Sequence, residues 1–434
     1  MELWAFVLPA VSFIEVTIVG RLIVTELLLL AMLPWLWSAR DRLRLPRWLV
    51  VLWAAWLVGQ IVTDLIVGSL FEDYARAWAA IVLTMTNLTA ILVLASTPRG
   101  ARFFAWGLAV GGVLGYLIVP NVYAASDPWK WAFALPAGLV LAAGLSGSFG
   151  YRSRWLTIGV FVAFGILNLI FGFRSLGGVS LLTAGYLTLS AVAGQRQVAR
   201  PRSLYRAGAG LALLVVAVAG TLQLYERAAL AGWLGADAEL VVETQTGELG
   251  VLLGGRSEVL VSTQAILDSP IIGHGSWAKD FTYVDLLAER RSSLGYEIGA
   301  GFSDIGLIPA HSFLLGSWVW AGVFGGLFWF AILVIAIWLL ANLYSVRVEV
   351  APLIVFSTML LLWNIAFSPY GFNGRITAPF GIALCLLGLR LISAGSFTTD
   401  TVVASTKGSS SRARAAYSPG IRHATTRRAS GKAE

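Results

Sequence analysis

Apolar runs of about 20 residues recur along most of the chain and are separated by short polar segments. A run of this length crosses the hydrocarbon core of a bilayer as one α-helix. Lipid admits only helices and closed barrels, because every backbone polar group must be paired internally. The pattern therefore predicts an all-α polytopic membrane protein with about 12 transmembrane helices. The predicted spans are 3–19, 21–38, 48–68, 77–96, 103–123, 131–149, 156–173, 176–194, 207–225, 319–343, 350–367 and 376–394.

Arginine is concentrated in alternate connections between the predicted spans. The arginine-rich connections are 39–47, 97–102, 151–154 and 194–206. Because cytoplasmic loops of membrane proteins carry an excess of Lys and Arg, we expect these loops and both termini in the cytoplasm. The chain opens on apolar residues with no basic segment before them. The first run is therefore expected to be a retained span and not a cleaved signal peptide.

One connection is much longer than the others. Residues 226–310 mix charged residues with Gly and Ser clusters and are predicted to form a large extracytoplasmic loop subdomain with short helices. Within it, 255–270 is predicted to be one helix that Pro270 ends. Long ordered loops are often functional, so we expect the function on the outer face. The expected organisation is 1–225 for the early transmembrane helices, 226–310 for the loop, 311–395 for the late ones and 396–434 for a disordered basic cytoplasmic tail.

Composition supports the membrane assignment and narrows the chemistry. The chain is 58% hydrophobic and only 12% charged, whereas soluble domains carry about 25% charged residues. The net charge of +8 follows mostly from the arginine-rich loops and the tail, so we expect contact with membrane lipids and no nucleic-acid partner. Cys385 is the single cysteine, and no Cys/His spacing typical of zinc is present, so no metal site is expected.

The ionisable residues predicted at the outer face include Arg174, Arg256, His311 and Arg375, with His274 in a Gly-rich turn nearby. Each has a structural alternative, because an arginine can anchor at the headgroup level and a histidine can belong to a turn or a helix end. Considered together, they indicate one site. The planar fork of arginine suits a diphosphate. A histidine beside it can act as a general base towards a hydroxyl.

Three stretches resemble the O-antigen ligase / O-antigen polymerase superfamily of membrane glycosyltransferases. "FRSLGG" (173–178) resembles its arginine turn after a middle span. "GRSEVLVSTQAILDSPIIGHG" (255–275) resembles its Gly-Arg…Pro-x-x-Gly-x-Gly block in the large outer loop. "AHSFLLGSWVWAGVFGG" (310–326) resembles its His-Asn-x-x-Leu…Gly-x-x-Gly block before a late span, with Ser312 where the family has Asn. The order of these blocks and the topology are also similar.

The resemblance implies a function as well as a fold. It implies transfer of a glycan from an undecaprenyl diphosphate carrier to an acceptor sugar hydroxyl, with inversion and without a metal or other cofactor. The acceptor would be a glycan or a lipid-linked molecule, and the site would face outwards from the bacterial cytoplasmic (inner) membrane. Arg174 and Arg256 would bind the diphosphate, and His311 would be the catalytic residue. Arg375 and His274 would be possible additional site residues.

Two other classes of protein fit the same sequence. A transporter or flippase of lipid-linked sugars would use arginines to bind a diphosphate without breaking a bond, although no internal repeat typical of transporters stands out. A non-catalytic scaffold for envelope assembly would need neither arginines nor a histidine at one site. The sequence also leaves open whether an enzyme of this kind would be a ligase or a polymerase.

Overall fold

The computed structural model describes most of the chain. The described residues are 1–17, 20–38, 45–120, 122–147, 153–193, 223–233, 256–295, 306–343, 348–371 and 374–415, with isolated positions between 220 and 243. The predicted span 207–225 therefore lies almost wholly outside the described residues. By internal contacts the chain divides into two units, Met1–Leu389 and Arg390–Glu434.

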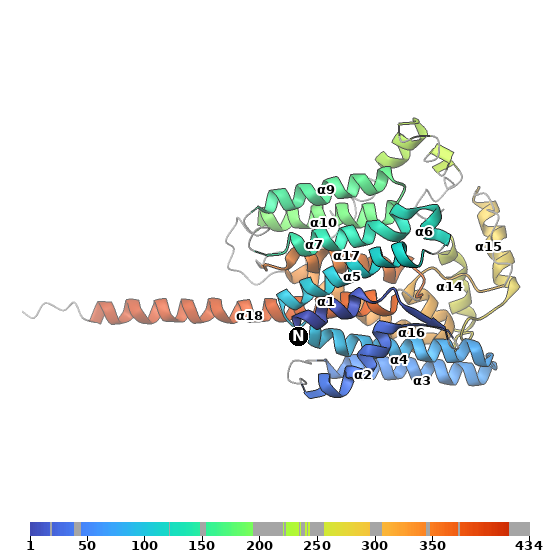
Figure 1. Cartoon of the computed structure of the whole chain (residues 1–434), viewed down its shortest axis with the longest axis horizontal. Coiled ribbons are helices and arrows are strands. Elements are labelled where there is room, and N and C mark those ends of the chain that lie inside the picture. The colour runs from blue at the N-terminus through green and yellow to red at the C-terminus, as the bar shows by residue number, and fades with distance from the viewer. Residues whose placement is uncertain are drawn as a thin grey trace, which may run out of the picture. The chain divides into compact units, whose positions relative to one another are not determined.

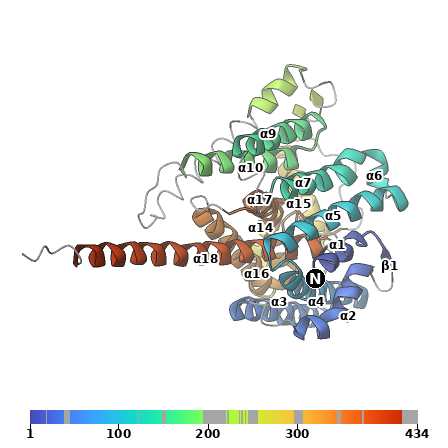
Figure 2. The ribbon, with the colours of Figure 1, turned by 60° about the vertical axis from the view of Figure 1, so that its left-hand side comes forward.

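The first unit is a bundle of helices with one small β-hairpin. Both views of the ribbon show α9 beside α10 and α3 beside α4, and the long helices run roughly along one direction (Figures 1 and 2). The elements are α1 (Glu2–Ala10), β1 (Glu15–Thr17), β2 (Arg21–Ile23), α2 (Val24–Ser38), α3 (Arg47–Val67), α4 (Phe71–Leu94), α5 (Pro98–Ile118), α6 (Val122–Ser126), the π-helix η2 (Trp129–Phe133), α7 (Ala134–Gly144), α9 (Arg154–Ile170), α10 (Arg174–Ala193), α14 (Glu258–Asp268), α15 (Phe281–Ser293), α16 (Phe313–Leu343), α17 (Ala351–Phe367) and α18 (Gly374–Ala415).

Among the described residues, six helices are long and apolar enough to cross a membrane. Four shorter helices are also apolar, and each overlaps a span that the sequence predicts. The pattern is that of an all-α membrane protein, as the sequence predicts at this coarse level. The six long apolar stretches are Arg47–Val67, Phe71–Leu94, Pro98–Ile118, Arg174–Val192, Phe313–Leu343 and Gly374–Ala394.

The first predicted span, 3–19, is wrong. Helix α1 ends at Ala10, directly after Pro9, whose ring cannot continue helical hydrogen bonding. The residues that follow are rich in β-branched side chains, which favour strands over helices. They form the antiparallel pair β1–β2, in which Val16 lies opposite Leu22. Hydropathy alone could not separate this hairpin from a span.

At the C-terminal end, α18 runs from Gly374 to Ala415. The disorder that the sequence predicts for 396–434 stays a prediction. No proline interrupts the sequence between Phe380 and Pro419, so nothing in this stretch forbids a continuous helix. Residues 416–434 lie outside the described part.

Helices α14 and α15 stand at one end of the long helices, across their direction (Figure 1). Helix α14 ends at Asp268, just before Pro270, as the sequence predicts. The pair has its own buried apolar core, which is shared with α16. Its members are Val261, Ala265, Ile266, Tyr283, Leu287, Ile308 and Val319. This core fixes α14 relative to the membrane helices.

The segment after α14 interlocks with a break in α16. At Gly322 the helix has φ +61° and ψ −155°, a combination open essentially to glycine alone. The backbone N–H of His274 donates to the carbonyl of Val319 (2.7 Å), and that of Gly275 donates to Trp320 (3.1 Å). A side chain at Gly322 would collide with the backbone of Ile271. The two chain segments therefore approach closely because this position carries no Cβ.

Replacing Gly322 with alanine should loosen this interlock. The strained backbone costs on the order of 1–3 kcal/mol for a residue with a Cβ, and the methyl group would push against the carbonyl of Ile271. We expect a lower apparent melting temperature in lipid nanodiscs. Gly159→Ala is the matched control, because Gly159 lies inside α9 with no atom near its missing Cβ. Equal melting temperatures for the two variants would contradict the interlock.

Candidate functional site

Three of the predicted site residues, Arg174, Arg256 and His311, lie around the first turn of α14. Arg256 and Ser257 precede this helix and Glu258 is its first residue. Other elements reach this point from distant parts of the sequence: α10 with Arg174, α15 with Arg291, and the segment before α16 with His311. We refer to these six residues as the α14 cluster.

Arg174 and Arg256 lie near each other. Their positive charges are close enough to repel, and both side chains are half-buried. Arg174 is placed by a tight turn in which Gly172 has φ +72° and the N–H of Phe173 donates to the carbonyl of Asn168 (2.8 Å). Two like charges held together by the fold favour binding of an anion between or beside them.

The third arginine of the cluster was not predicted from the sequence. Arg291, in the last turn of α15, donates through Nη1 to Oγ of the buried Ser257 (2.9 Å). The start of α14 adds the positive end of a helix dipole. The cluster therefore brings three arginines together with the carboxylate of Glu258.

The contact between α14 and α15 brings Arg291 to Ser257. The phenol of Tyr283 donates to Asp268 (2.7 Å), and the amide of Gln264 donates to the same carboxylate (2.9 Å). These hydrogen bonds lower the pKa of Asp268. Burial raises the pKa of Tyr283, so the phenol remains a donor. The hydrogen bond between Tyr283 and Asp268 joins the C-terminal end of α14 to the first turn of α15.

Within the cluster, His311 contacts Glu258. Its Nδ1 lies 3.4 Å from Oε1 of Glu258, with side chains 46% and 18% exposed respectively. The next residue, Ser312, begins α16: its hydroxyl accepts from the N–H of Leu315 (3.0 Å) and donates to the carbonyl of Ile365 (2.7 Å). Serine and asparagine are both favoured in this capping role, so Ser312 meets the structural requirement that Asn would meet.

His274 is engaged elsewhere. Its Nε2 pairs with the carbonyl of Ala265 (2.7 Å), its ring packs edge-on against Tyr283 (5.4 Å between centroids), and its backbone joins α16. The structure thus gives His274 a role in holding the turn after α14, in line with the structural alternative.

A buried carboxylate in α3 secures the same turn, and sequence reasoning missed it. Asp64 is 2% exposed and accepts from both the backbone N–H and the hydroxyl of Ser276 (2.7 Å each). It also accepts from Ser69 (2.7 Å) and from the indole of Trp78 (2.8 Å). An aspartate within a predicted span was the available signal, because charges at that depth are costly unless paired.

Arg375 belongs to a separate buried network. Its Nη2 lies 3.0 Å from Oε2 of Glu26, which is fully buried, and donates to the carbonyl of Arg21 (2.6 Å). Asn87 donates to the backbone carbonyl of Arg375 (2.7 Å). These contacts link α2, α4 and α18. They give Arg375 a structural partner that the sequence did not reveal.

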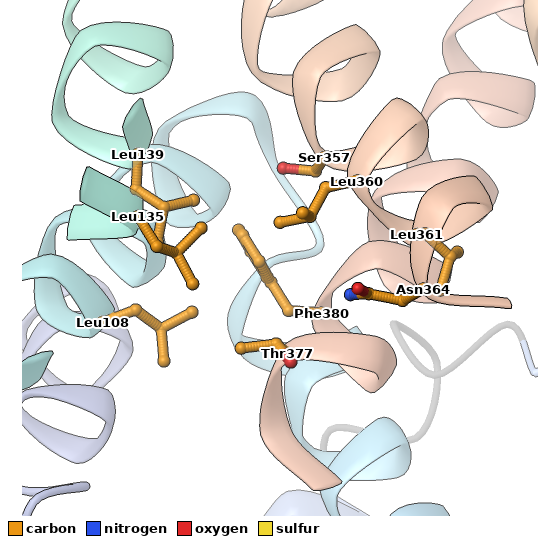
Figure 3. Close-up of a pocket in the computed structure, with 9 residues that line it drawn as sticks. All are labelled: Leu108, Leu135, Leu139, Ser357, Leu360, Leu361, Asn364, Thr377 and Phe380. Atoms are coloured by element: carbon orange, nitrogen blue, oxygen red, sulfur yellow. The ribbon is translucent and has the colours of Figure 1, made fainter. Parts of the chain in front are cut away.

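A small pocket lies between α5, α7, α17 and α18 (Figure 3). Leucine side chains such as Leu108 and Leu360 line most of it, and Ser357, Asn364 and Thr377 supply its polar atoms. It contains no ionisable side chain and none of the residues of the α14 cluster. The side chains that line it therefore include no ionisable acid or base.

Metal ligands do not gather in the described part of the chain, where no group of three His, Cys, Asp or Glu residues is close enough to hold an ion. Comparisons with protein-family models, with curated proteins and with solved structures gave no match. The functional interpretation therefore depends on the geometry of the α14 cluster and on the three motifs quoted above.

Removing Arg375 should damage folding and not only activity. Losing one partner of a buried ion pair costs about 3–5 kcal/mol, because the other charge stays buried. We expect Arg375→Leu to lower the melting temperature in nanodiscs and Glu26→Leu/Arg375→Leu to recover much of the loss. Arg99→Leu is the control, since Arg99 forms an exposed ion pair with Glu2. A stable but inactive Arg375→Leu protein would instead place Arg375 in the site.

Proposed function

We propose that the protein transfers a glycan from an undecaprenyl diphosphate carrier to a sugar hydroxyl at the outer face of the bacterial cytoplasmic membrane. The observation that carries the proposal is the meeting of Arg174, Arg256 and Arg291 with the Glu258–His311 pair at the start of α14. An anion site next to a potential base is what displacement of a diphosphate by a hydroxyl requires. The motif resemblance supports the same chemistry.

The proposed reaction is a single displacement. The acceptor hydroxyl oxygen forms a bond to the anomeric carbon of the donor sugar while the bond from that carbon to the phosphate oxygen breaks. The hydroxyl proton passes to His311, and undecaprenyl diphosphate leaves with the bonding electron pair. The arginines stabilise the charge that grows on the leaving diphosphate. The arginines act on the donor diphosphate, whereas His311 acts on the acceptor hydroxyl. Variants of the arginines and of His311 should therefore have different effects on the donor KM and on kcat.

The location of the cluster also fits a lipid-linked donor. Arg174 opens α10 and His311 precedes α16, and both helices have the length and hydropathy of membrane spans. In a bilayer their ends lie near the headgroups, where the diphosphate of a polyprenyl carrier lies. The glycan would then extend towards α15. Ligation to a lipid-linked acceptor and polymerisation onto another carrier-linked repeat both fit this arrangement.

The first test is the size profile of surface glycans in cells that lack the gene. Restoration of a long ladder by wild type but not by His311→Ala is the result expected for a polymerase. Long chains that accumulate on the lipid carrier in the deletion strain indicate a ligase. Complete restoration by His311→Ala, with normal membrane insertion, would remove the base from the mechanism and favour a transporter or scaffold.

The second test compares the donor KM of two variants of Arg256, the arginine proposed to bind the diphosphate. Arg256→Ala should raise the donor KM more than Arg256→Lys, because lysine keeps the charge but loses the two-pronged hydrogen bond. We expect about a tenfold or larger rise in KM for the alanine variant, the loss of one charge-assisted hydrogen bond. Arg227→Ala, outside the cluster, serves as the control. Wild-type KM values in both Arg256 variants would refute the diphosphate assignment.

A further inference from the structure

Glu258 stands between the arginines and His311. Its Oε1 is 3.4 Å from Nδ1 of His311, while the preceding residue Ser257 holds Arg291 and Arg256 lies one residue further back. The carboxylate of Glu258 therefore lies next to Nδ1 of His311. The other ring nitrogen, Nε2, is the proposed base. Nothing in the sequence motif required this contact.

Both members of the pair are attached to rigid backbone. Glu258 begins a helix whose buried face, including the fully buried Val261 and Ala265, packs into the core shared with α15 and α16. His311 directly precedes Ser312, which caps α16 and binds α17 through Ile365. The separation of Glu258 and His311 is therefore set by packed helices and not by a loose surface loop.

We propose that Glu258 is a positioning residue for His311. This inference rests on the proposed function. The carboxylate lies next to Nδ1 (3.4 Å), where its charge favours the tautomer that carries the proton on Nδ1 and the lone pair on Nε2. When Nε2 takes the proton of the acceptor hydroxyl, the positive charge on the ring is stabilised by the adjacent carboxylate. Glu258 itself stays ionised, and no proton moves to it.

The second oxygen of Glu258 argues against a purely structural ion pair. Oε2 is buried and has no hydrogen-bond partner among the described residues. A buried carboxylate retained for folding normally has both oxygens satisfied, as Asp64 has in this protein. Glu258 therefore directs one oxygen at His311 while its other oxygen makes no structural contact in the described part of the chain.

The tautomer can be measured without any substrate. The full-length protein, labelled with ¹⁵N-histidine and held in nanodiscs, has three histidines, and the signals of His311 are assigned by their loss in His311→Gln. We expect a protonated Nδ1 and an unprotonated Nε2 in wild type at a pH where the ring is neutral. In Glu258→Gln the Nε2–H form should gain population. An Nε2–H tautomer in wild type, or one unchanged by Glu258→Gln, would overturn the proposal.

Turnover gives the second readout. The donor is the lipid-linked glycan extracted from the deletion strain, and the enzyme is the full chain in nanodiscs. Glu258→Gln should lower kcat by about 10- to 100-fold, a part of the 10²–10⁴-fold that a general base contributes, with little change in donor KM. Glu258→Asp should recover part of the loss. Glu289→Gln, an exposed glutamate on α15, should behave as wild type.

The outcomes separate this inference from the proposed function. If Glu258→Gln has wild-type kcat while His311→Ala is inactive, the positioning role fails and the base remains. If Glu258→Gln loses more activity than His311→Ala, Glu258 is the base and the assignment is reversed. If wild type transfers no glycan, the proposed function fails, and the positioning role fails with it even where the tautomer is as expected.

Discussion

The arrangement of the α14 cluster depends on the hydrogen bonds that the carboxylate of Asp64 accepts. This carboxylate lies within an apolar helix, so it is stable there only because hydrogen-bond donors from two other segments surround it. One of those segments is the turn after α14, and the same turn is bonded to the break in α16. The turn after α14 is thereby attached to α3 and α16 by side-chain and backbone hydrogen bonds together.

This attachment determines the electrostatics of the α14 cluster. A loop helix that could swing freely would relieve the repulsion between Arg174 and Arg256 by moving away. The hydrogen bonds of the turn and the apolar core shared with α15 and α16 oppose that movement. The positions of Arg174 and Arg256 are therefore held by packed elements, which is the preorganisation that the proposed function requires.

The sequence predicted some of these features well and others not at all. The helix that begins near Arg256 and stops before Pro270 was predictable, because its apolar spacing and terminating proline are local signals. The proximity of Arg174 to Arg256 was a hypothesis that no local pattern could test, since 81 intervening residues lie between them in the sequence. The contact of His311 with Glu258 and the arrival of Arg291 from α15 depend on tertiary packing in the same way. The first predicted span failed because β-branched apolar residues are equally compatible with a hairpin. The pairing of Arg375 with Glu26 had no local signal, because Glu26 lies near the other end of the chain.

Arg256 and Glu258 are two residues apart on one rigid element, which has a consequence for how such a protein can diversify. A displacement of α14 would move the anion-binding group and the partner of the histidine by the same amount. Small shifts of α14 therefore cannot change the position of Arg256 without also changing that of Glu258. Under the proposed function, new glycan preferences would therefore have to arise from substitutions outside α14.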